Sequence, residues 1–456
     1  MKVMKFGGSS VADVASIARV VDIVRDNVSR EGLCVVVSAM KGVTDEIIDL
    51  AKAACLKDEA YKERLHNLKK RHLSVFEAVC EDPAEYRDFV ENQCGEIHSV
   101  CDGVYALGEL SPKVLDRLMA FGELCSARIL TLACRGAGLA ARFEDSRDYI
   151  VTDNRFGRAR VDFARTDAAL NELNFSGAPV LVFPGLIARC TDGRVTTLGR
   201  DGSDYTAAII GAAIGAEAVE IWTNVNGVMT ANPEHVADAR SIPQMSYEEA
   251  MELSHFGARV IHPPTMHPLT ARNIPIIVRN TFNPSFVGTR IGSETAGRGG
   301  ILTGISAIPR VSFLRLEGPG MVGVRGVAGR LFSALAAEDV NLIMISQGSS
   351  EHSICFAVVP DDEDKSVDVI SREFAVEMSH QIVLPPAVER NKCAIAVVGD
   401  NMRSRPGIAG RLFSCLGDAD VNILAIAQGS SERNISMVID AADETRALVA
   451  IHSAFF

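Results

Sequence analysis

The chain has 456 residues and a formal net charge of −12, and its length predicts about three domains at roughly 150 residues each. Because nucleic acid or an anionic membrane needs a basic face, the acidic balance argues against both as partners. The longest apolar stretch, residues 207–216, is well short of the about 20 residues that span a bilayer. The eleven cysteines form no CxxC pair. With neither a signal peptide nor a metal site expected, they predict reduced thiols in a cytoplasmic protein.

The N-terminus predicts a phosphate-binding loop. An apolar strand over residues 3–6 contains Lys5 and breaks into Gly7 and Gly8, and apolar residues then recur at helical spacing from 11 to 24. Paired glycines let backbone amides and a helix N-terminus approach an anion, and the lysine adds a positive charge for a transferring phosphoryl group. The same pattern is often only a tight connection, so its interpretation depends on the rest of the chain.

Strand-like and helical runs alternate through the first two thirds of the chain, which predicts a mostly parallel sheet covered by helices on both faces. A charged stretch over residues 57–105 has helical spacing and predicts an insertion with solvated faces, for which a lid is one interpretation. Small residues over 293–300 predict a linker. The expected buried strands are residues 33–38, 179–183, 218–223 and 274–278.

The C-terminal third contains an internal repeat, because residues 321–357 align without gaps to residues 402–438. Each copy predicts a strand, glycine loop, helix, two strands and a second helix, so the region is a tandem of small α+β modules. The first copy continues into an expected strand at 381–384 that the second copy lacks. A strand over residues 301–308 is the substitute, and we therefore expect interlocked modules.

A second polar segment runs from Thr197 to Ala208, where Arg200, Ser203 and Asp204 lie on a glycine-containing turn before an apolar helix. A guanidinium suits a carboxylate, a hydroxyl suits an anion or amine, and a carboxylate suits a metal or a lysine. The alternative is a helix-capping aspartate with a surface arginine.

Together, Lys-Phe-Gly-Gly-Ser-Ser and Leu-Gly-Arg-x-Gly-Ser-Asp-Tyr-Thr-Ala resemble aspartate kinases, which have the amino-acid kinase fold, and the tandem modules resemble their ACT domains. The resemblance covers essentially the whole chain. Further matching segments are Ser38-Ala39 with Thr44, Phe121-Gly122-Glu123, residues 220–223, 249–253 and 256–258.

The resemblance implies an α/β kinase domain over residues 1–292, followed by ACT modules over 312–388 and 391–456. It also implies ATP with Mg²⁺ as the phosphoryl donor and L-aspartate as the acceptor, phosphorylated on its side-chain carboxylate. That carboxylate is already ionised, so no general base is needed. The implied catalytic residues are Lys5 and Asp204, and the implied substrate contacts are Arg200 to the α-carboxylate, Glu123 to the α-ammonium, and Thr44 and Ser203 through hydroxyls.

The implied nucleotide contacts depart from the family pattern in one strip. Asn224, Met229, Asn232 and Glu234 stand where aspartate kinases usually have Asp, Tyr, Asp and Arg, and Arg259 replaces a lysine. Loss of a stacking ring and a charge inversion predict weaker or retuned purine-nucleotide contacts. The implied set is Gly7, Gly8, Ser10, Thr223, Asn224, Met229, Glu234 and Arg259.

The repeated segment ending in Gln-Gly-Ser-Ser-Glu resembles the threonine-sensing type of aspartate kinase. Effector contacts are implied for Gln347 and Gln428, supported by Asn341 and Asn422, although such residues also cap strands and satisfy turns. With no room for a homoserine dehydrogenase after Phe456, we expect a monofunctional enzyme, inhibited by threonine and forming a homodimer or a dimer of dimers through its ACT modules.

Two other functions stay open from the sequence. The altered nucleotide strip is compatible with a catalytically weak protein that senses amino acids through its ACT modules. A kinase for another acidic amino acid is disfavoured, because the set of Thr44, Glu123, Arg200 and Ser203 is complete.

Overall fold

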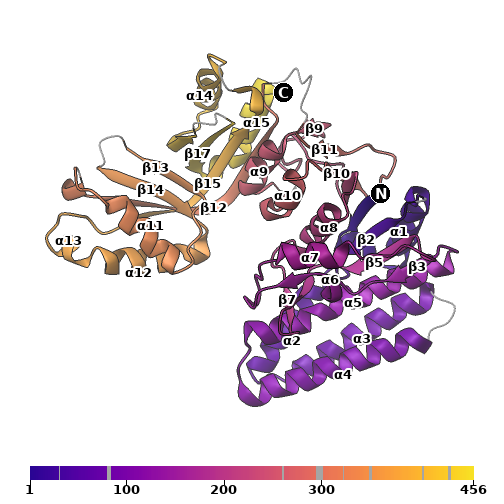
Figure 1. Cartoon of the computed structure of the whole chain (residues 1–456). Helices are drawn as coiled ribbons and strands as arrows, with labels where there is room; N and C mark the ends of the chain where they lie inside the picture. Colours follow the sequence, from indigo (N-terminus) through magenta and orange to yellow (C-terminus); the bar gives the residue numbers. More distant parts are fainter. Residues whose placement is uncertain are drawn as a thin grey trace. The chain divides into compact units, whose positions relative to one another are not determined.

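The computed structural model (Figure 1) describes residues 1–29, 31–79, 84–258, 261–293, 301–321, 323–348, 352–402, 405–429 and 433–456. It divides into two compact units. The first comprises residues 1–228, 243–247 and 261–294, and the second comprises residues 229–242, 248–260 and 295–456. No helix in these described ranges has both the length and the apolar composition needed to cross a membrane.

The first unit is built on an eight-stranded sheet in the order β3-β5-β2-β1-β8-β10-β11-β9. Neighbouring strands from β3 to β10 are parallel, and β11 is antiparallel to β10. The expected parallel sheet is confirmed, and its strands β2 and β5 are fully buried and apolar, as is typical of strands covered on both faces. The strands are β1 (Lys2–Phe6), β2 (Leu33–Val37), β3 (Ala141–Phe143), β5 (Val180–Pro184), β8 (Ala218–Thr223), β9 (Gln244–Met245), β10 (Ile276–Asn280) and β11 (Thr289–Ile291).

A small second sheet lies in the same unit, in the order β4-β6-β7. Its strands are β4 (Val151–Thr152), β6 (Ile187–Cys190) and β7 (Val195–Thr197). The short helices of the unit are α6 (Ser146–Tyr149), α7 (Phe163–Leu170), α8 (Gly202–Ala213) and α10 (Pro263–Thr270).

The first helix begins later than the sequence predicts. Residues 8–11 form a 3-10 turn, η1 (Gly8–Val11), and α1 (Val14–Asn27) starts only after Asp13. The Asp13 carboxylate accepts a hydrogen bond from the Ser16 amide at 2.8 Å and so caps the helix. The glycines therefore do not lie at an α-helix N-terminus, and the expected contribution of this helix dipole is wrong.

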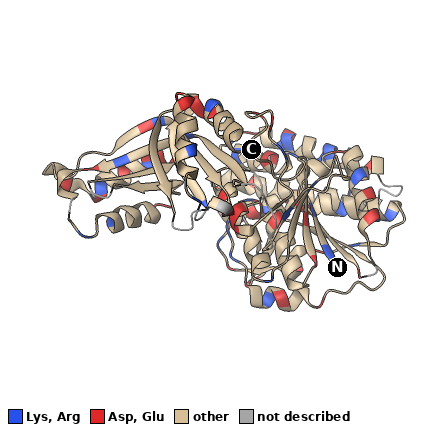
Figure 2. Ribbon diagram, turned by 90° about the horizontal axis from the view of Figure 1, so that it is seen from above, with Lys and Arg blue, Asp and Glu red and all other residues tan. Residues whose placement is uncertain are grey.

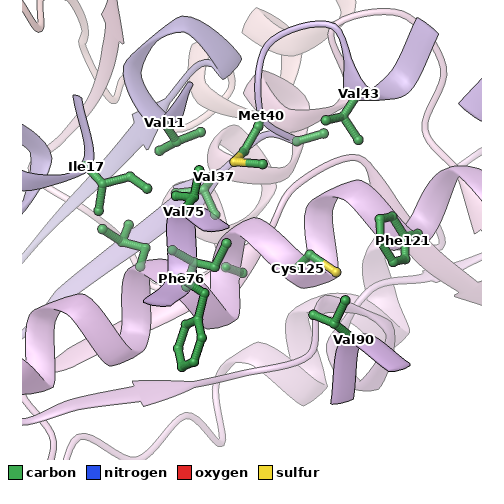
Figure 3. Packing of buried hydrophobic residues seen from close by; sticks show 14 of the residues in the cluster. Val11, Ile17, Val37, Met40, Val43, Val75, Phe76, Val90, Phe121 and Cys125 are labelled. Atoms are coloured by element: carbon green, nitrogen blue, oxygen red, sulfur yellow. The ribbon is translucent and has the colours of Figure 1, made fainter. Parts of the chain in front are cut away.

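The predicted insertion is helical and belongs to the main core of the first unit. Here α3 (Ala60–Val79) and α4 (Ala84–Leu107) pack with α2 (Val43–Cys55) and α5 (Pro112–Gly136). Figure 3 shows Val75 and Phe76 of α3 in the same cluster as Val11, Ile17 and Val37. Because α3 and α4 contribute buried side chains to this core, the structure does not support their interpretation as a lid.

The second unit contains one six-stranded sheet in the order β13-β14-β12-β15-β17-β16. The first half of β12 pairs with the end of β15, and its second half pairs with β14. The two modules therefore share their long strands, and residues 304–308 of β12 pair with the strand of the second module. The strands are β12 (Gly304–Glu317), β13 (Met344–Gln347), β14 (Ser353–Val358), β15 (Ala387–Val398), β16 (Ile423–Gln428) and β17 (Asn434–Asp440).

Both shared strands change conformation at the boundary between the modules. Arg310 and Asn391 have φ angles of 56° and 55°, and the register of β12 against β15 shifts between Ile308 and Val311. The expected strand at 381–384 is wrong, since that segment follows α13 (Ala375–Ser379) as a turn and the strand begins at Ala387. Helices α11 (Val327–Ala337), α12 (Glu363–Glu373), α14 (Ile408–Asp418) and α15 (Glu444–Phe455) complete the modules.

Two segments that precede the predicted boundary at residue 292 pack with the second unit. Thr230 forms a 3.0 Å hydrogen bond with His452 of α15, and its carbonyl accepts from the Ile305 amide. In α9 (Tyr247–His255), the carboxylate of Glu252 accepts from Asn434 at 2.8 Å. Basic and acidic positions are interspersed along the helices of both units (Figure 2).

Candidate active site

The candidate site begins at the carboxyl end of β1, where Lys5 meets a carboxylate from another element. Lys5 Nζ lies 2.6 Å from Asp204 Oδ1, and each side chain is only 12% exposed. Asp204 lies in the first turn of α8, so the ion pair joins the central strand to this helix. The sequence-based pairing of Lys5 with Asp204 has the geometry that it requires.

The glycine loop is held against the end of β2. The Lys41 amide donates to the Gly8 carbonyl at 3.0 Å, and the Gly7 amide donates to the Trp222 carbonyl at 3.2 Å. A Cβ at Gly8 would lie 2.8 Å from the Ala39 carbonyl oxygen, so only glycine fits there without a shift. At Gly7, the position of a Cβ lies 3.6 Å from the Lys5 ammonium, which places that charge beside the loop.

Glu123 contributes a second, buried carboxylate. It is 2% exposed, and within the described parts of the chain its Oε2 has no hydrogen-bond partner. Burial raises the pKa of Glu123 to about 8, opposed by hydrogen bonding to the Ala39 backbone. A Cβ at Gly122 would lie 2.6 Å from the Ala39 Cβ, and this close approach brings α5 to the residues beside the glycine loop.

The remaining substrate candidates lie in the loop before α8, in the first turn of α8 and in the first turn of α2. Asp201 has a φ of 52°, and Ser203 is buried against Gly185, where a Cβ would lie 2.5 Å from its Oγ. Arg200 is 81% exposed and its nearest carboxylate partner is Asp201 at 3.8 Å, so its guanidinium is accessible to a ligand. Thr44 is half-buried in the first turn of α2.

Five of the implied nucleotide residues gather in the first unit. Besides Gly7 and Gly8, Ser10 Oγ lies 2.8 Å from Thr281 Oγ1, and the Thr281 amide donates to the Thr223 carbonyl at 2.8 Å. Asn224 follows at the exposed end of β8. No motif in the sequence singles out Thr281, whose hydroxyl contacts the residue after the paired glycines and whose amide bonds to β8.

The other implied nucleotide residues are distributed differently. Met229 and Glu234 belong to the second unit, where Glu234 is exposed and its amide donates to Asn232 Oδ1 at 3.0 Å. Arg259 lies outside the described residues.

The implied effector residues lie on or beside the two edge strands of the second sheet. Asn341, Gln347, Asn422 and Gln428 are all exposed. Ser346 Oγ of β13 donates to the Ile426 carbonyl of β16 at 3.0 Å. The two edge strands therefore lie next to each other within the chain, and each carries one of the glutamines.

The described ranges contain no group of three or more His, Cys, Asp or Glu that could hold a metal ion. Magnesium commonly binds through substrate phosphates with only one or two protein carboxylates. A magnesium ion that arrives with a nucleotide would need few ligands from the protein.

Family comparisons cover both units. The model described as "Amino acid kinase family" matches residues 1–280, and an ACT domain model matches residues 314–374 and 395–455. A bifunctional aspartokinase/homoserine dehydrogenase of Daucus carota is 37% identical over 465 residues, covering 99% of this chain and 50% of that protein. The chain thus spans about half the length of such bifunctional relatives.

Aspartokinase 1 of Arabidopsis thaliana is 30% identical and is covered to 80% of its length by 100% of this chain. The crystal structure of E. coli aspartokinase III with aspartate and ADP superposes with a TM-score of 0.85 at 27% identity, covering 100% of this chain and 99% of that one. The family model, the relatives and the fold agree: this chain belongs to the aspartokinases of the amino acid kinase family, with two ACT domains.

Proposed function

We propose that this chain transfers the γ-phosphoryl group of ATP to the side-chain carboxylate of L-aspartate, giving 4-phospho-L-aspartate and ADP. The observation that carries the proposal is the Lys5–Asp204 ion pair beside the glycine loop. Phosphoryl transfer to a carboxylate needs a preorganised positive charge and backbone donors, and it needs no proton acceptor. The structure of a similar enzyme with aspartate and ADP supports the substrate pair.

In the proposed mechanism, one oxygen of the aspartate side chain attacks the γ-phosphorus while the bond to the β-phosphate oxygen breaks. Lys5 stabilises the negative charge on the transferring group, and Asp204 fixes the lysine. Gly7 and Gly8 permit close approach of phosphate oxygens to the backbone. A magnesium ion bound to the ATP phosphates would supply further neutralisation of their charge.

The substrate's other groups would meet the residues around the loop. The unpartnered Glu123 oxygen suits the α-ammonium, because an ammonium ion supplies the donors that this carboxylate lacks. The exposed Arg200 guanidinium suits the α-carboxylate through two parallel hydrogen bonds. Thr44 and Ser203 would supply hydroxyl contacts.

We also propose that threonine inhibits the enzyme by binding at the ACT modules. Gln347 and Gln428 occupy the same register on adjacent edge strands, and both side chains are exposed. A small amino acid needs partners at both charged ends, which one module alone does not supply. Lysine is the rival effector, since a similar aspartokinase III structure contains lysine and aspartate.

Exposed apolar side chains on these edge strands support a homodimer formed through the ACT modules. Ile345, Leu424 and Ile426 are 44%, 36% and 41% exposed, and a sheet edge offers unpaired backbone groups to another chain. We expect this assembly to act in the cytoplasm.

A catalytically weak amino-acid sensor is the second candidate function. It is favoured by Met229 and Glu234, which replace the family's stacking and basic residues and belong to the second unit. Normal effector binding with no aspartate-dependent ADP formation would select the sensor over the kinase.

Lys5→Met should lower kcat by about 100- to 1000-fold, because one preorganised charge at the transferring phosphoryl group is lost. Steady-state kinetics with aspartate and ATP measures the effect. Lys2→Met is the matched control: Lys2 lies on the same strand and pairs with buried Glu220 at 3.3 Å, yet should keep its turnover. Near-normal kcat in folded Lys5→Met would remove this lysine from the mechanism.

Arg200→Lys should raise the aspartate KM by about 10- to 100-fold while leaving the ATP KM nearly unchanged, since an ammonium cannot reproduce a bidentate contact with a carboxylate. Arg194→Lys is the control, because Arg194 pairs with Asp192 in the preceding turn. A rise in the ATP KM alone would mean that Arg200 contacts the nucleotide and not aspartate.

Glu123 should make stability fall as pH rises. Its pKa lies near 8 in the folded chain against about 4.3 when unfolded, so the folded state holds a proton that the unfolded state releases between these values. Relative to Glu123→Gln, the free energy of unfolding of the wild type should therefore fall by on the order of 1 kcal/mol for each pH unit between pH 5 and 8. Urea unfolding of both proteins across this range measures the difference, and parallel pH profiles would contradict it.

Gln347→Ala and Gln428→Ala should each desensitise the enzyme to threonine while leaving uninhibited turnover nearly unchanged. Coupling of about 1 to 3 kcal/mol corresponds to a roughly 5- to 150-fold change in apparent affinity. Threonine and lysine titrations of activity in wild type and both variants make the comparison. Identical threonine curves in all three proteins, or inhibition by lysine alone, would refute the assignment.

A further inference from the structure

One buried carboxylate near the site has no place in the proposed mechanism. Asp116 is 1% exposed and lies on α5, seven residues before Glu123. Seven residues are two turns of an α-helix, so both carboxylates project from the same side of α5. Two buried acids on one helix face require separate explanations, because an unpaired buried charge is costly.

Asp116 is fully engaged, in contrast to Glu123. Its Oδ2 accepts from the Gly157 amide at 2.9 Å and from the Thr197 amide at 3.0 Å, and its Oδ1 accepts from Thr197 Oγ1 at 2.7 Å. Burial raises the pKa of Asp116, and these three donors oppose that rise. A carboxylate at this position therefore satisfies three donors from two different segments.

One of these segments continues along the chain to Arg200 and Ser203, and the other packs against it. Thr197 is the last residue of β7, only three residues before Arg200. The second segment supports the first, since the Ala159 amide donates to the Thr197 carbonyl at 3.1 Å. Gly199 also lies against Gly157, whose carbonyl would be 3.3 Å from a Cβ there. Asp116 thus connects the segment that leads to Arg200 and Ser203 with α5, the helix that contains Glu123.

We propose that Asp116 is a positioning residue that fixes the Arg200–Ser203 loop relative to Glu123, so that both ends of the substrate amino acid are held at one separation. The inference rests on the proposed roles of Arg200 and Glu123. Small displacements of positioned groups cost up to about 100-fold in enzyme efficiency, and loss of Asp116 would release the loop without removing any group that touches substrate.

The test compares Asp116→Ala, Asp116→Asn and Thr197→Val by steady-state kinetics, with folding checked by circular dichroism. Asp116→Ala should raise the aspartate KM about tenfold or more and change the ATP KM less than about twofold. Asp116→Asn should recover most of the loss, because its amide oxygen can still accept from both backbone amides while the Thr197 hydroxyl reverses its role. Thr197→Val loses one hydrogen bond and should be intermediate, and it provides the test if Asp116→Ala does not fold.

Thr196→Val is the matched control, since Thr196 is equally buried on the same strand but bonds to Thr152 at 2.7 Å instead. Equal effects of Thr196→Val and Thr197→Val would mean that Asp116 contributes only to the stability of the fold, and would overturn the proposal. Parallel rises in the aspartate KM and the ATP KM would have the same meaning. An unchanged aspartate KM in folded Asp116→Ala would also overturn it. If Arg200→Lys raises the aspartate KM in that case, only this inference fails; if Arg200→Lys has no effect either, the proposed substrate site fails.

Discussion

The site depends on one ion pair, between Lys5 at the end of the central strand and Asp204 in the first turn of α8, with 2.6 Å between their charged atoms. Removing one partner of a buried pair typically costs 3–5 kcal/mol, because the other charge is left without compensation. The pair therefore fixes the lysine and also ties α8 to the sheet. The strand that leads into the glycine loop is thereby joined to the helix that follows Arg200.

Close backbone approach completes the arrangement. Gly8 packs against the Ala39 carbonyl, and Gly122 packs against the Ala39 side chain. The glycine loop and α5 therefore meet at the same residue. Glu123 is consequently buried beside the loop with an unsatisfied oxygen, an unfavourable state that a ligand ammonium would relieve. The carboxyl ends of β1 and β2 thus combine a positive charge for the phosphoryl group with a buried carboxyl group that an ammonium ion would ionise and pair with.

Much of this could be predicted from the sequence, because buried parallel strands form continuous β-branched runs and because two separated motifs carry the polar residues. The gapless repeat likewise predicted tandem modules, and the absence of a closing strand in the second copy was the reason to expect them to interlock. The start of α1 was missed although Asp13 and Ser16 are a recognisable capping pair. Asp116 and Thr281 could not be found, because their importance lies in contacts with residues distant in sequence. The strand at 381–384 failed because tertiary pairing with β12 begins only at Ala387.

The Lys5–Asp204 pair and the glycine loop suit phosphoryl transfer to a carboxylate at the carboxyl end of β1. The most direct measurement is trapping of the acyl phosphate with hydroxylamine in the presence of L-aspartate, ATP and magnesium, with ADP measured in the same reaction. We expect aspartyl hydroxamate and ADP to form in a one-to-one ratio, and only when aspartate is present. ADP release without hydroxamate, or no reaction at saturating aspartate and ATP, would contradict the proposed function.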